Sequence, residues 1–309
     1  MLKQLVNDCR ITFRIVADEP ILIKSGHATI DGADMAFVQT FRNERWQIYI
    51  PGSSVKGLIR SHCERIVRTI KEETACNPFM NSGADQSCGK LFENSGLSNE
   101  EVYRNSCPIC KMFGSTAYGS RVGTSDCYLI NNPSKQVRDG VGIDRFTGGA
   151  FDRAKFDLEV YTGAKFEGEI HVRNFELWQL GLLGFVFQDL QDGYLQIGSG
   201  KSRGLGRIGG TVEQVEISYI SPKVSAMPAD ELWGVGALFE KGDYGFSAKD
   251  KVAYNGRPAI KQKGLRAGLV WQGSEQTNML WEHLLPAWKA FVTSIPNLSV
   301  RSQVAAGRG

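Results

Sequence analysis

The feature that most constrains the fold is a strand that stops at a Pro-Gly pair and passes directly into an amphipathic helix. Residues 45–50 (Arg-Trp-Gln-Ile-Tyr-Ile) have the aromatic and β-branched content of a strand, and Pro51-Gly52 ends it. Over residues 53–73, apolar side chains recur at the i, i+3, i+4 and i+7 positions of a one-sided helix. Ser53 and Ser54 stand at its start, where serine side chains cap helices. The stretch therefore predicts a strand, a tight turn and a capped helix.

The opposite face of this predicted helix is basic. It carries Lys56, Arg60, Arg68 and Lys71, with Arg65 beside them. Backbone N–H groups and the positive end of the helix dipole favour a phosphate at the helix N-terminus. The predicted contacts to a polyanion are Ser53, Ser54, Lys56 and Arg60. The alternative is a capped surface helix whose basic face is only solvated.

Length and charge narrow the possibilities. A chain of 309 residues is one elaborated domain or two small ones. Its 36 Lys and Arg residues against 33 Asp and Glu give a net charge of only +3, which excludes a uniformly basic surface and confines any nucleic-acid site to a local stripe. No apolar run approaches the length of a membrane span, and the residues after Met1 lack a hydrophobic signal region. We therefore expect a cytoplasmic protein without a membrane partner.

Four of the seven cysteines gather in one segment, at positions 76, 88, 107 and 110. Cys107-Pro-Ile-Cys110 has the two-residue gap of a knuckle that directs two thiolates at one metal ion, and Cys76 and Cys88 lie in a loop-like segment that can complete a tetrahedron. Four sulfur ligands predict structural zinc, because a closed shell leaves no position for water. Buried thiols or a redox pair are the alternative, and His62 is a weaker candidate for the fourth ligand in place of Cys76.

A glycine-rich run covers residues 198–210 and contains Gly200-Lys201-Ser202. A nucleotide-binding P-loop needs a glycine five residues before Gly200, where this chain has Leu195, and it needs a following helix, where this chain has a strand-like segment from residue 211. Alternating glycines with Lys201, Arg203 and Arg207 suit backbone amides and cations laid along a phosphate chain. A glycine-rich turn that merely packs tightly is the alternative.

The remaining patterns predict an α+β fold. Strands are expected at residues 9–16, 45–50, 121–130 and 211–218, a hairpin at 156–161 and 165–172, and helices at 53–73, 175–190 and 278–292. Residues 24–44 and 134–155 are predicted to be polar loops. This order is close to a ferredoxin-like βαββαβ plan with insertions. The predicted parts are a core of residues 1–73 and 121–218, a cysteine-rich insertion at 74–120, and a C-terminal extension at 219–309.

Five ordered stretches resemble the RAMP (repeat-associated mysterious protein) superfamily. They are Tyr49 to Arg60, Cys107 to Gly114, Ser120-Arg121-Val122, Ile143 to Gly148, and Gly198 to Gly206. In this order, over about residues 8–215, they are similar to the repeated backbone subunit of a type III CRISPR effector complex, a system of antiviral defence. The resemblance implies a modified RNA-recognition fold whose copies stack along a CRISPR RNA. It also implies that the cysteine-rich insertion of this chain binds zinc.

The resemblance assigns RNA contacts to parts of the chain. The helix at 53–73 and the glycine run would hold the guide backbone, and the loop around residues 143–145 would lead into a hairpin thumb within residues 134–172 that displaces guide–target base pairs at even intervals. The implied RNA contacts outside the helix are Arg145, Phe146, Gly198, Gly200, Lys201, Ser202 and Arg203. The implied partners are CRISPR RNA, target RNA, neighbouring backbone copies and other subunits of the complex.

In family members that cut their target, one aspartate in the loop corresponding to residues 24–44 is needed for metal-dependent cleavage. Asp34 is the better match by its Gly-x-Asp context, and Asp31 is second. A carboxylate beside a phosphodiester holds Mg²⁺ or Mn²⁺, which lowers the pKa of a 2′-hydroxyl or stabilises the leaving oxygen. His27 is a candidate general base. Ordinary turn chemistry of Asp-Gly is the alternative for both aspartates.

Three functions remain open. The first is a guide-binding backbone subunit that also cuts target RNA, and the second is the same scaffold without cleavage. The third is a repeat-processing endonuclease of the same superfamily with metal-free chemistry. The third is disfavoured because such enzymes usually carry the glycine-rich loop near the C-terminus, whereas about a hundred residues follow it in this chain.

Overall fold

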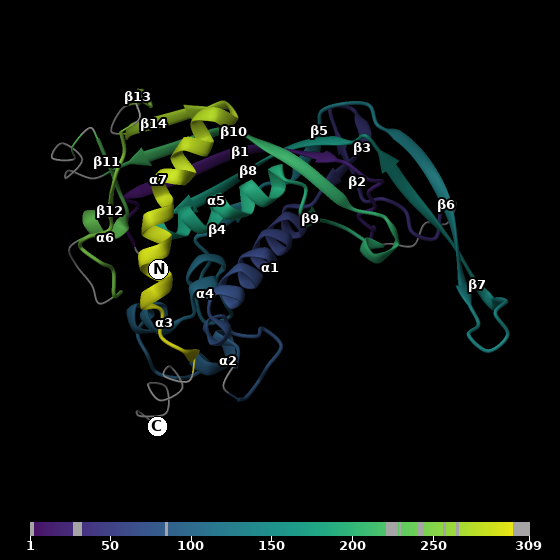
Figure 1. Ribbon diagram of the computed structural model, residues 1–309, viewed down its shortest axis with the longest axis horizontal. Helices are drawn as coiled ribbons and strands as arrows, with labels where there is room; N and C mark the ends of the chain where they lie inside the picture. Colours follow the sequence, from purple (N-terminus) through teal and green to yellow (C-terminus); the bar gives the residue numbers. More distant parts are fainter. Residues whose placement is uncertain are drawn as a thin grey trace.

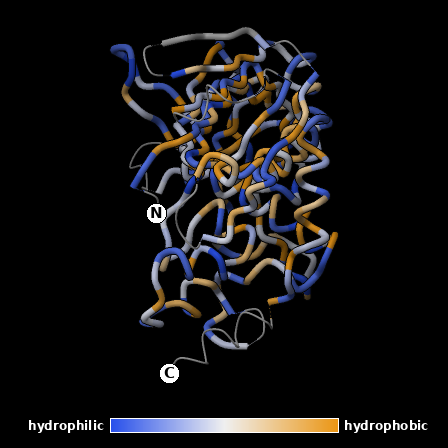
Figure 2. Tube along the Cα trace, turned by 90° about the vertical axis from the view of Figure 1, so that its left-hand side faces the viewer, coloured by the Kyte–Doolittle hydropathy of each residue, from blue (hydrophilic) through white to orange (hydrophobic). Residues whose placement is uncertain are grey.

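The computed structural model describes residues 3–26, 33–83, 86–220, 228, 230–239, 244–255, 258–263 and 266–298. Over these residues the fold is mixed α and β: a large antiparallel sheet runs across the molecule, and α1 (Gly52–Ile70) and α5 (Leu177–Gln191) lie along one side of it (Figure 1). Hydrophobic segments gather in the middle of the molecule (Figure 2). The predicted α+β class is confirmed.

The large sheet is built around β1. Its strands are β1 (Asn7–Ala17), β2 (Gln39–Arg42), β3 (Arg45–Ile50), β4 (Val122–Thr124), β5 (Cys127–Leu129), β8 (Lys165–Arg173), β9 (Leu195–Gln196), β10 (Arg207–Tyr219), β13 (Ala259–Lys263) and β14 (Arg266–Gln272). The order is β13-β14-β10-β1-β8-β5-β3-β2, with β4 beside β8 and β9 beside β10. Cys9 of β1 pairs with Ile217 of β10 on one side and with Val172 of β8 on the other.

Smaller elements surround this sheet. They are the hairpin of β6 (Ser134–Ile143) and β7 (Ala150–Thr162), the pair β11 (Glu231–Trp233) and β12 (Lys251–Ala253), the short helices α2 (Cys88–Phe92), α3 (Asn99–Asn105), α4 (Pro108–Phe113) and α6 (Val235–Leu238), the 3₁₀ turns η1 (Glu72–Thr74) and η2 (Lys201–Arg203), and the long helix α7 (Gly273–Ser294). Within the described residues, no helix combines the length and hydrophobicity that crossing a membrane requires.

The core lies between the sheet and its helices. Alternate residues of β1 are buried, and the ring of Phe13 lies 5.6 Å from that of Phe187 on α5. Helix α5 is buried almost all round because α7 covers its outer side. At Gly184 an added Cβ would lie 3.1 Å from the Trp281 side chain, so the small residue permits this close approach. The C-terminal extension is thus part of the core: β14 pairs with β10, and α7 packs on α5.

The other face of the central strands carries exposed ion pairs. Arg14 of β1 lies 3.1 Å from both Glu167 of β8 and Glu213 of β10, and Arg10 lies 3.5 Å from Glu169. Arg14 stands directly opposite Glu167, and the other two pairs are diagonal across neighbouring strands, where opposite charges stabilise a sheet modestly. Over β1, β8 and β10 this face therefore carries charges of both signs.

Four details of the predicted elements are wrong. The hairpin expected at 156–161 and 165–172 does not form, because β7 pairs with β6 and β8 pairs with β1. The loop expected at 134–155 is instead β6 and the start of β7. Residues 39–42 form β2, which turns at Asn43 and Glu44, both with positive φ, into β3. The strand expected at 121–130 is divided into β4 and β5.

Candidate nucleic-acid interface and metal centre

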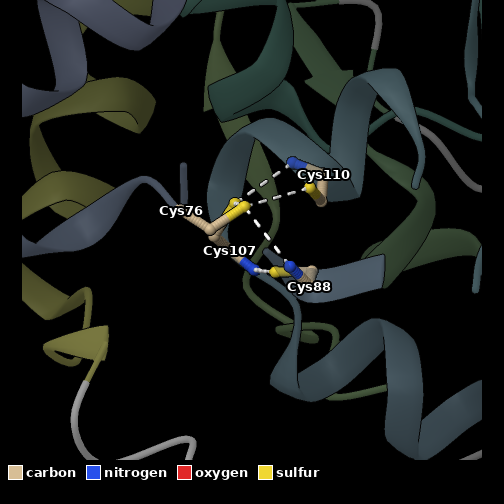
Figure 3. Close-up of side chains that lie close together, drawn as sticks. All are labelled: Cys76, Cys88, Cys107 and Cys110. Atoms are coloured by element: carbon tan, nitrogen blue, oxygen red, sulfur yellow. Dashed lines mark hydrogen bonds between the residues drawn. The ribbon is translucent and has the colours of Figure 1, made fainter. Parts of the chain in front are cut away.

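Four cysteine side chains meet in the insertion between α1 and β4. The sulfurs of Cys76, Cys88, Cys107 and Cys110 all lie within 4.8 Å of one another, and all four residues are buried (Figure 3). The Cys76 sulfur is 3.6 Å from the sulfurs of both Cys107 and Cys110. The backbone N–H of Cys107 donates to the Cys88 sulfur at 3.3 Å, and that of Cys110 to the Cys107 sulfur at 3.4 Å.

This geometry fits a tetrahedral metal ion. Zinc–sulfur bonds of about 2.3 Å give a tetrahedron whose sulfurs are about 3.8 Å apart, close to the 3.6 Å from the Cys76 sulfur to those of Cys107 and Cys110. The separations are far beyond the roughly 2.05 Å of a disulfide bond. Hydrogen bonding to Cys107 and the other sulfurs, together with burial, raises the pKa of Cys110, because a second thiolate is unfavourable so near the first without a cation. The cluster can therefore bind a metal such as zinc. His62 is not part of this cluster, in which Cys76 is the fourth member; its Nε2 instead lies 2.5 Å from Asp189 Oδ2.

The N-terminus of α1 is fastened to the sheet rather than capped by serine. Pro51 is the N-cap residue, so Ser53 and Ser54 lie within the first turn, and the predicted side-chain caps do not form. The Gly52 N–H donates to Asp126 Oδ1 at 2.7 Å. A carboxylate therefore already interacts with the positive end of the helix. Ser53 is exposed and Ser54 is half-buried.

Most side chains of the predicted basic face of α1 form hydrogen bonds with other parts of the protein. The Arg60 guanidinium donates to Glu64 and to the Gly114 carbonyl, Arg68 donates to the Cys76 carbonyl at 2.9 Å, and Lys71 donates to the Ile295 carbonyl at 2.5 Å. Lys56 donates to Ser120 Oγ at 2.9 Å, and burial with the nearby Arg60 charge lowers the pKa of Lys56. The face thus secures the cysteine-rich insertion and the end of α7 against α1.

The glycine-rich run forms a compact loop between β9 and β10. Gly198, Gly200, Gly204 and Gly206 all have positive φ, which glycine adopts without strain. The loop is anchored by hydrogen bonds from the Ser199 N–H to the Leu22 carbonyl and from the Gly206 N–H to the Pro20 carbonyl. Its outer turn, residues 201–203, is exposed. The loop leads into β10 rather than a helix, which agrees with the exclusion of a P-loop.

Three segments that are distant in sequence converge on β7 about midway along the β6–β7 hairpin. Asp34 Oδ2 accepts a hydrogen bond from the Asp157 N–H at 3.1 Å, and the Met35 N–H donates to the Asp157 carbonyl at 3.0 Å. The guanidinium carbon of Arg203 lies 5.5 Å from the ring centroid of Phe156. An exposed carboxylate and the cationic glycine loop therefore contact adjacent residues of β7. Asp31 and His27 lie outside the described residues.

The sequence did not indicate that Phe156 and Asp157 of the hairpin would contact Arg203 and Asp34. Phe156 and Asp157 are in a segment that was predicted to be a strand, but nothing local pairs them with residue 34. A hydrogen bond to Asp139, with partial burial and that residue's charge, raises the pKa of Asp157. The acidic surroundings of Asp34 therefore extend onto both strands of the hairpin.

The β6–β7 hairpin projects from the body of the molecule (Figure 1). Arg145 and Phe146 lie in the turn at its tip, and Phe146 is 97% exposed. Asp144 accepts hydrogen bonds from the Phe146 N–H and the Thr147 hydroxyl, which holds the turn in shape. Further exposed apolar side chains of the hairpin are Val137, Val141, Ile143 and Phe151. Such a concentration of exposed apolar groups on a projecting arm is typical of a contact surface.

Comparison with protein families gives one match. The family model of the RAMP superfamily matches residues 15–209, which include α1, the cysteine cluster, the projecting hairpin and the glycine loop. No curated protein matches the chain. Because the family match covers well over half of the 309 residues, the chain belongs to the RAMP superfamily.

Proposed function

We propose that the chain is a backbone subunit of a type III CRISPR effector complex, which binds the sugar–phosphate chain of the guide RNA and cleaves target RNA paired with it. The observation that carries the proposal is that Asp34 and the exposed Arg203 contact consecutive residues of β7, Asp34 the backbone of Asp157 and Arg203 the ring of Phe156. Family membership supports RNA binding. A cation, an aromatic ring and a carboxylate along β7 suit contact with RNA and attack on its phosphodiester.

The fold supports a ferredoxin-like plan of the modified RNA-recognition type. The sequence β1-α1-β5-β8-α5-β10 gives the strand order β10-β1-β8-β5 at the centre of the sheet, with both helices on one side. The open face of an ordinary RNA-recognition fold stacks bases on aromatic side chains. Here the corresponding strands, β1 and β8, carry paired Arg and Glu side chains. RNA is therefore bound at the glycine loop, the start of α1 and the hairpin.

The proposed RNA contacts fall into two groups. The first holds the guide backbone through Ser53, Ser54 and Lys56 at the start of α1 and through Gly198, Gly200, Lys201, Ser202 and Arg203 of the glycine loop. The second is the tip of the thumb hairpin, where the exposed Phe146 and Arg145 interrupt the guide–target duplex. Arg60 is directed at the cysteine-rich insertion instead.

Two metal ions belong to the proposal. Structural Zn²⁺ would be held by Cys76, Cys88, Cys107 and Cys110, which the sulfur geometry favours. For cleavage, Mg²⁺ or Mn²⁺ supplies positive charge beside the scissile phosphate. The exposed Asp34 carboxylate is the candidate ligand, and Asp31 is the second candidate. The hydrogen bond from the Asp157 N–H fixes one Asp34 oxygen.

The test uses the assembled complex, labelled target RNA and Mg²⁺. Wild type is expected to cut at evenly spaced sites, whereas Asp34→Ala should bind the target but leave it intact. Asp152→Ala, which removes a carboxylate elsewhere on β7, serves as the control and should cut normally. Cleavage by Asp34→Ala at the same sites would remove Asp34 from the mechanism, and Asp31→Ala then identifies the second candidate. If wild type fails to cut, the chain is the non-cleaving scaffold.

A further inference from the structure

One row of charged side chains on α1 faces the cysteine cluster. Arg60, Glu64 and Arg68 are spaced by four residues, so they lie on one side of the helix. Glu64 lies 3.1 Å from Arg60 Nε and 3.6 Å from Arg68 Nη1. A single carboxylate thereby holds both guanidinium groups in place.

Both arginines contact the segments that carry the cysteines. Arg60 Nη2 is 3.7 Å from the Cys110 sulfur, and Arg60 Nη1 donates to the Gly114 carbonyl at 3.2 Å. Arg68 donates to the Cys76 carbonyl at 2.9 Å. Arg68 therefore fixes the backbone of one cysteine, whereas Arg60 reaches a sulfur atom.

A metal-loaded cluster would carry a negative charge, which a neighbouring cation would offset. Four thiolates around one divalent ion carry a net charge of −2, and a buried net charge is costly unless an opposite charge offsets it. Hydrogen bonds to ligand atoms also orient the ligands and tune metal affinity. The Arg60 guanidinium meets both requirements, because it is a permanent cation with several fixed donors.

We propose that Arg60 is a positioning residue of the metal centre: it donates to the Cys110 thiolate, offsets the charge of the loaded cluster and slows metal loss. The inference rests on the metal-binding part of the proposed function. It removes Arg60 from the predicted RNA contacts, although its place in the sequence, one turn after Lys56, had favoured that role.

A cavity of about 500 Å³ adjoins this contact. Its wall includes Arg60, Cys76, Cys88 and Cys110. We expect a chelator to approach the sulfurs through this cavity, whose wall includes Arg60. Loss of Arg60 therefore removes both a hydrogen bond and a barrier.

The first measurement is the rate of zinc release from the purified full chain to a chromogenic chelator. Arg60→Gln should release zinc about tenfold faster than wild type, since loss of a residue that supports metal ligands typically costs ten- to a hundredfold in affinity. The matched control is Arg65→Gln, which removes an exposed arginine from the same helix and should release zinc at the wild-type rate. A rate for Arg60→Gln within about twofold of the control overturns the inference. If Arg60→Gln does not fold, Arg60→Lys compared with Arg65→Lys decides in the same way.

A second measurement distinguishes the thiolate contact from general support of the fold. In the cobalt-substituted chain, Arg60→Gln should shift the sulfur-to-cobalt charge-transfer band to lower energy, because the thiolate loses a hydrogen bond; an unshifted band contradicts the contact. Guide RNA affinity of the zinc-loaded variant should equal that of wild type. If affinity for RNA falls while zinc release is unchanged, Arg60 contacts RNA and the inference fails. Neither metal measurement uses RNA, so they stand even if the RNA proposal fails.

Discussion

At the scale of single residues, the glycine loop shows which glycines are required and which are only tolerated. Gly206 has φ +87°, and a Cβ there would lie 2.3 Å from the Ile197 carbonyl oxygen. Gly204 has φ +71°, but a Cβ there would meet nothing within 4 Å. A side chain at position 206 would have both an unfavourable backbone conformation and a clash with the backbone, whereas one at position 204 would have only the unfavourable conformation.

We predict that Gly206→Ala destabilises the protein by clearly more than Gly204→Ala. A left-handed conformation costs a non-glycine residue about 1–2 kcal/mol, which is the expected loss for Gly204→Ala, and the clash at Gly206 adds to it. Urea unfolding of the two variants measures the difference. Equal losses would show that the loop relaxes around the new methyl group.

At the scale of elements, local patterns predicted the long helices α1, α5 and α7, but not the short helices α2, α3, α4 and α6 or the contacts between elements. The apolar periodicity of residues 53–73 is a property of the helix alone, and α1 formed close to the expected bounds. The basic side chains of α1 donate hydrogen bonds to the carbonyls of Gly114, Cys76 and Ile295. These residues lie between eight and more than two hundred positions along the chain from the side chains that contact them. No local pattern encodes such contacts. The hairpin predicted at 156–161 and 165–172 was wrong because β6, the partner of β7, has the polar composition of a loop.

The cysteine-rich insertion was the long-range arrangement that sequence could predict, because metal-ligand spacing is itself a local signal. We predict about one zinc ion per chain, lost when Cys107 and Cys110 are replaced by serine. Removing the ion should lower the melting temperature, because the cluster joins short helices α2 and α4 that are too short to persist alone. Elemental analysis and calorimetry measure both effects. The absorbance of an iron–sulfur cluster would contradict the zinc assignment.

At the scale of the whole molecule, the C-terminal extension is fastened to the core by a carboxylate. Asp250 accepts hydrogen bonds from the Leu177 N–H at 3.1 Å, at the start of α5, and from the Gly236 N–H at 3.4 Å. Burial raises the pKa of Asp250 to about 7, the charge of Glu176 adds to the rise, and these N–H groups and Arg121 offset only part of it. The extension and α5 therefore share a group that titrates near neutral pH.

This group predicts a pH dependence of stability. A carboxyl whose pKa is higher in the folded than in the unfolded protein binds more protons when folded, so its contribution to the free energy of unfolding falls as pH rises between about 4 and about 7. Wild type should lose up to about 1.4 kcal/mol per pH unit from this source within that range. Asp250→Asn should lack this contribution when the free energy of unfolding, measured with urea, is plotted against pH. The same dependence on pH in the two proteins would exclude Asp250 as the titrating group.

We propose that exposed cations of the glycine loop hold an RNA backbone without reading its sequence. The direct measurement is the affinity of wild type, Lys201→Ala and the control Lys249→Ala for two guide RNAs of unrelated sequence over a range of salt concentrations. Lys201→Ala should weaken binding of both guides by the same factor and reduce the slope of log affinity against log salt by about one, with Lys249→Ala unchanged. Loss of affinity for one guide only, or an unchanged slope, would contradict binding of the RNA backbone by Lys201.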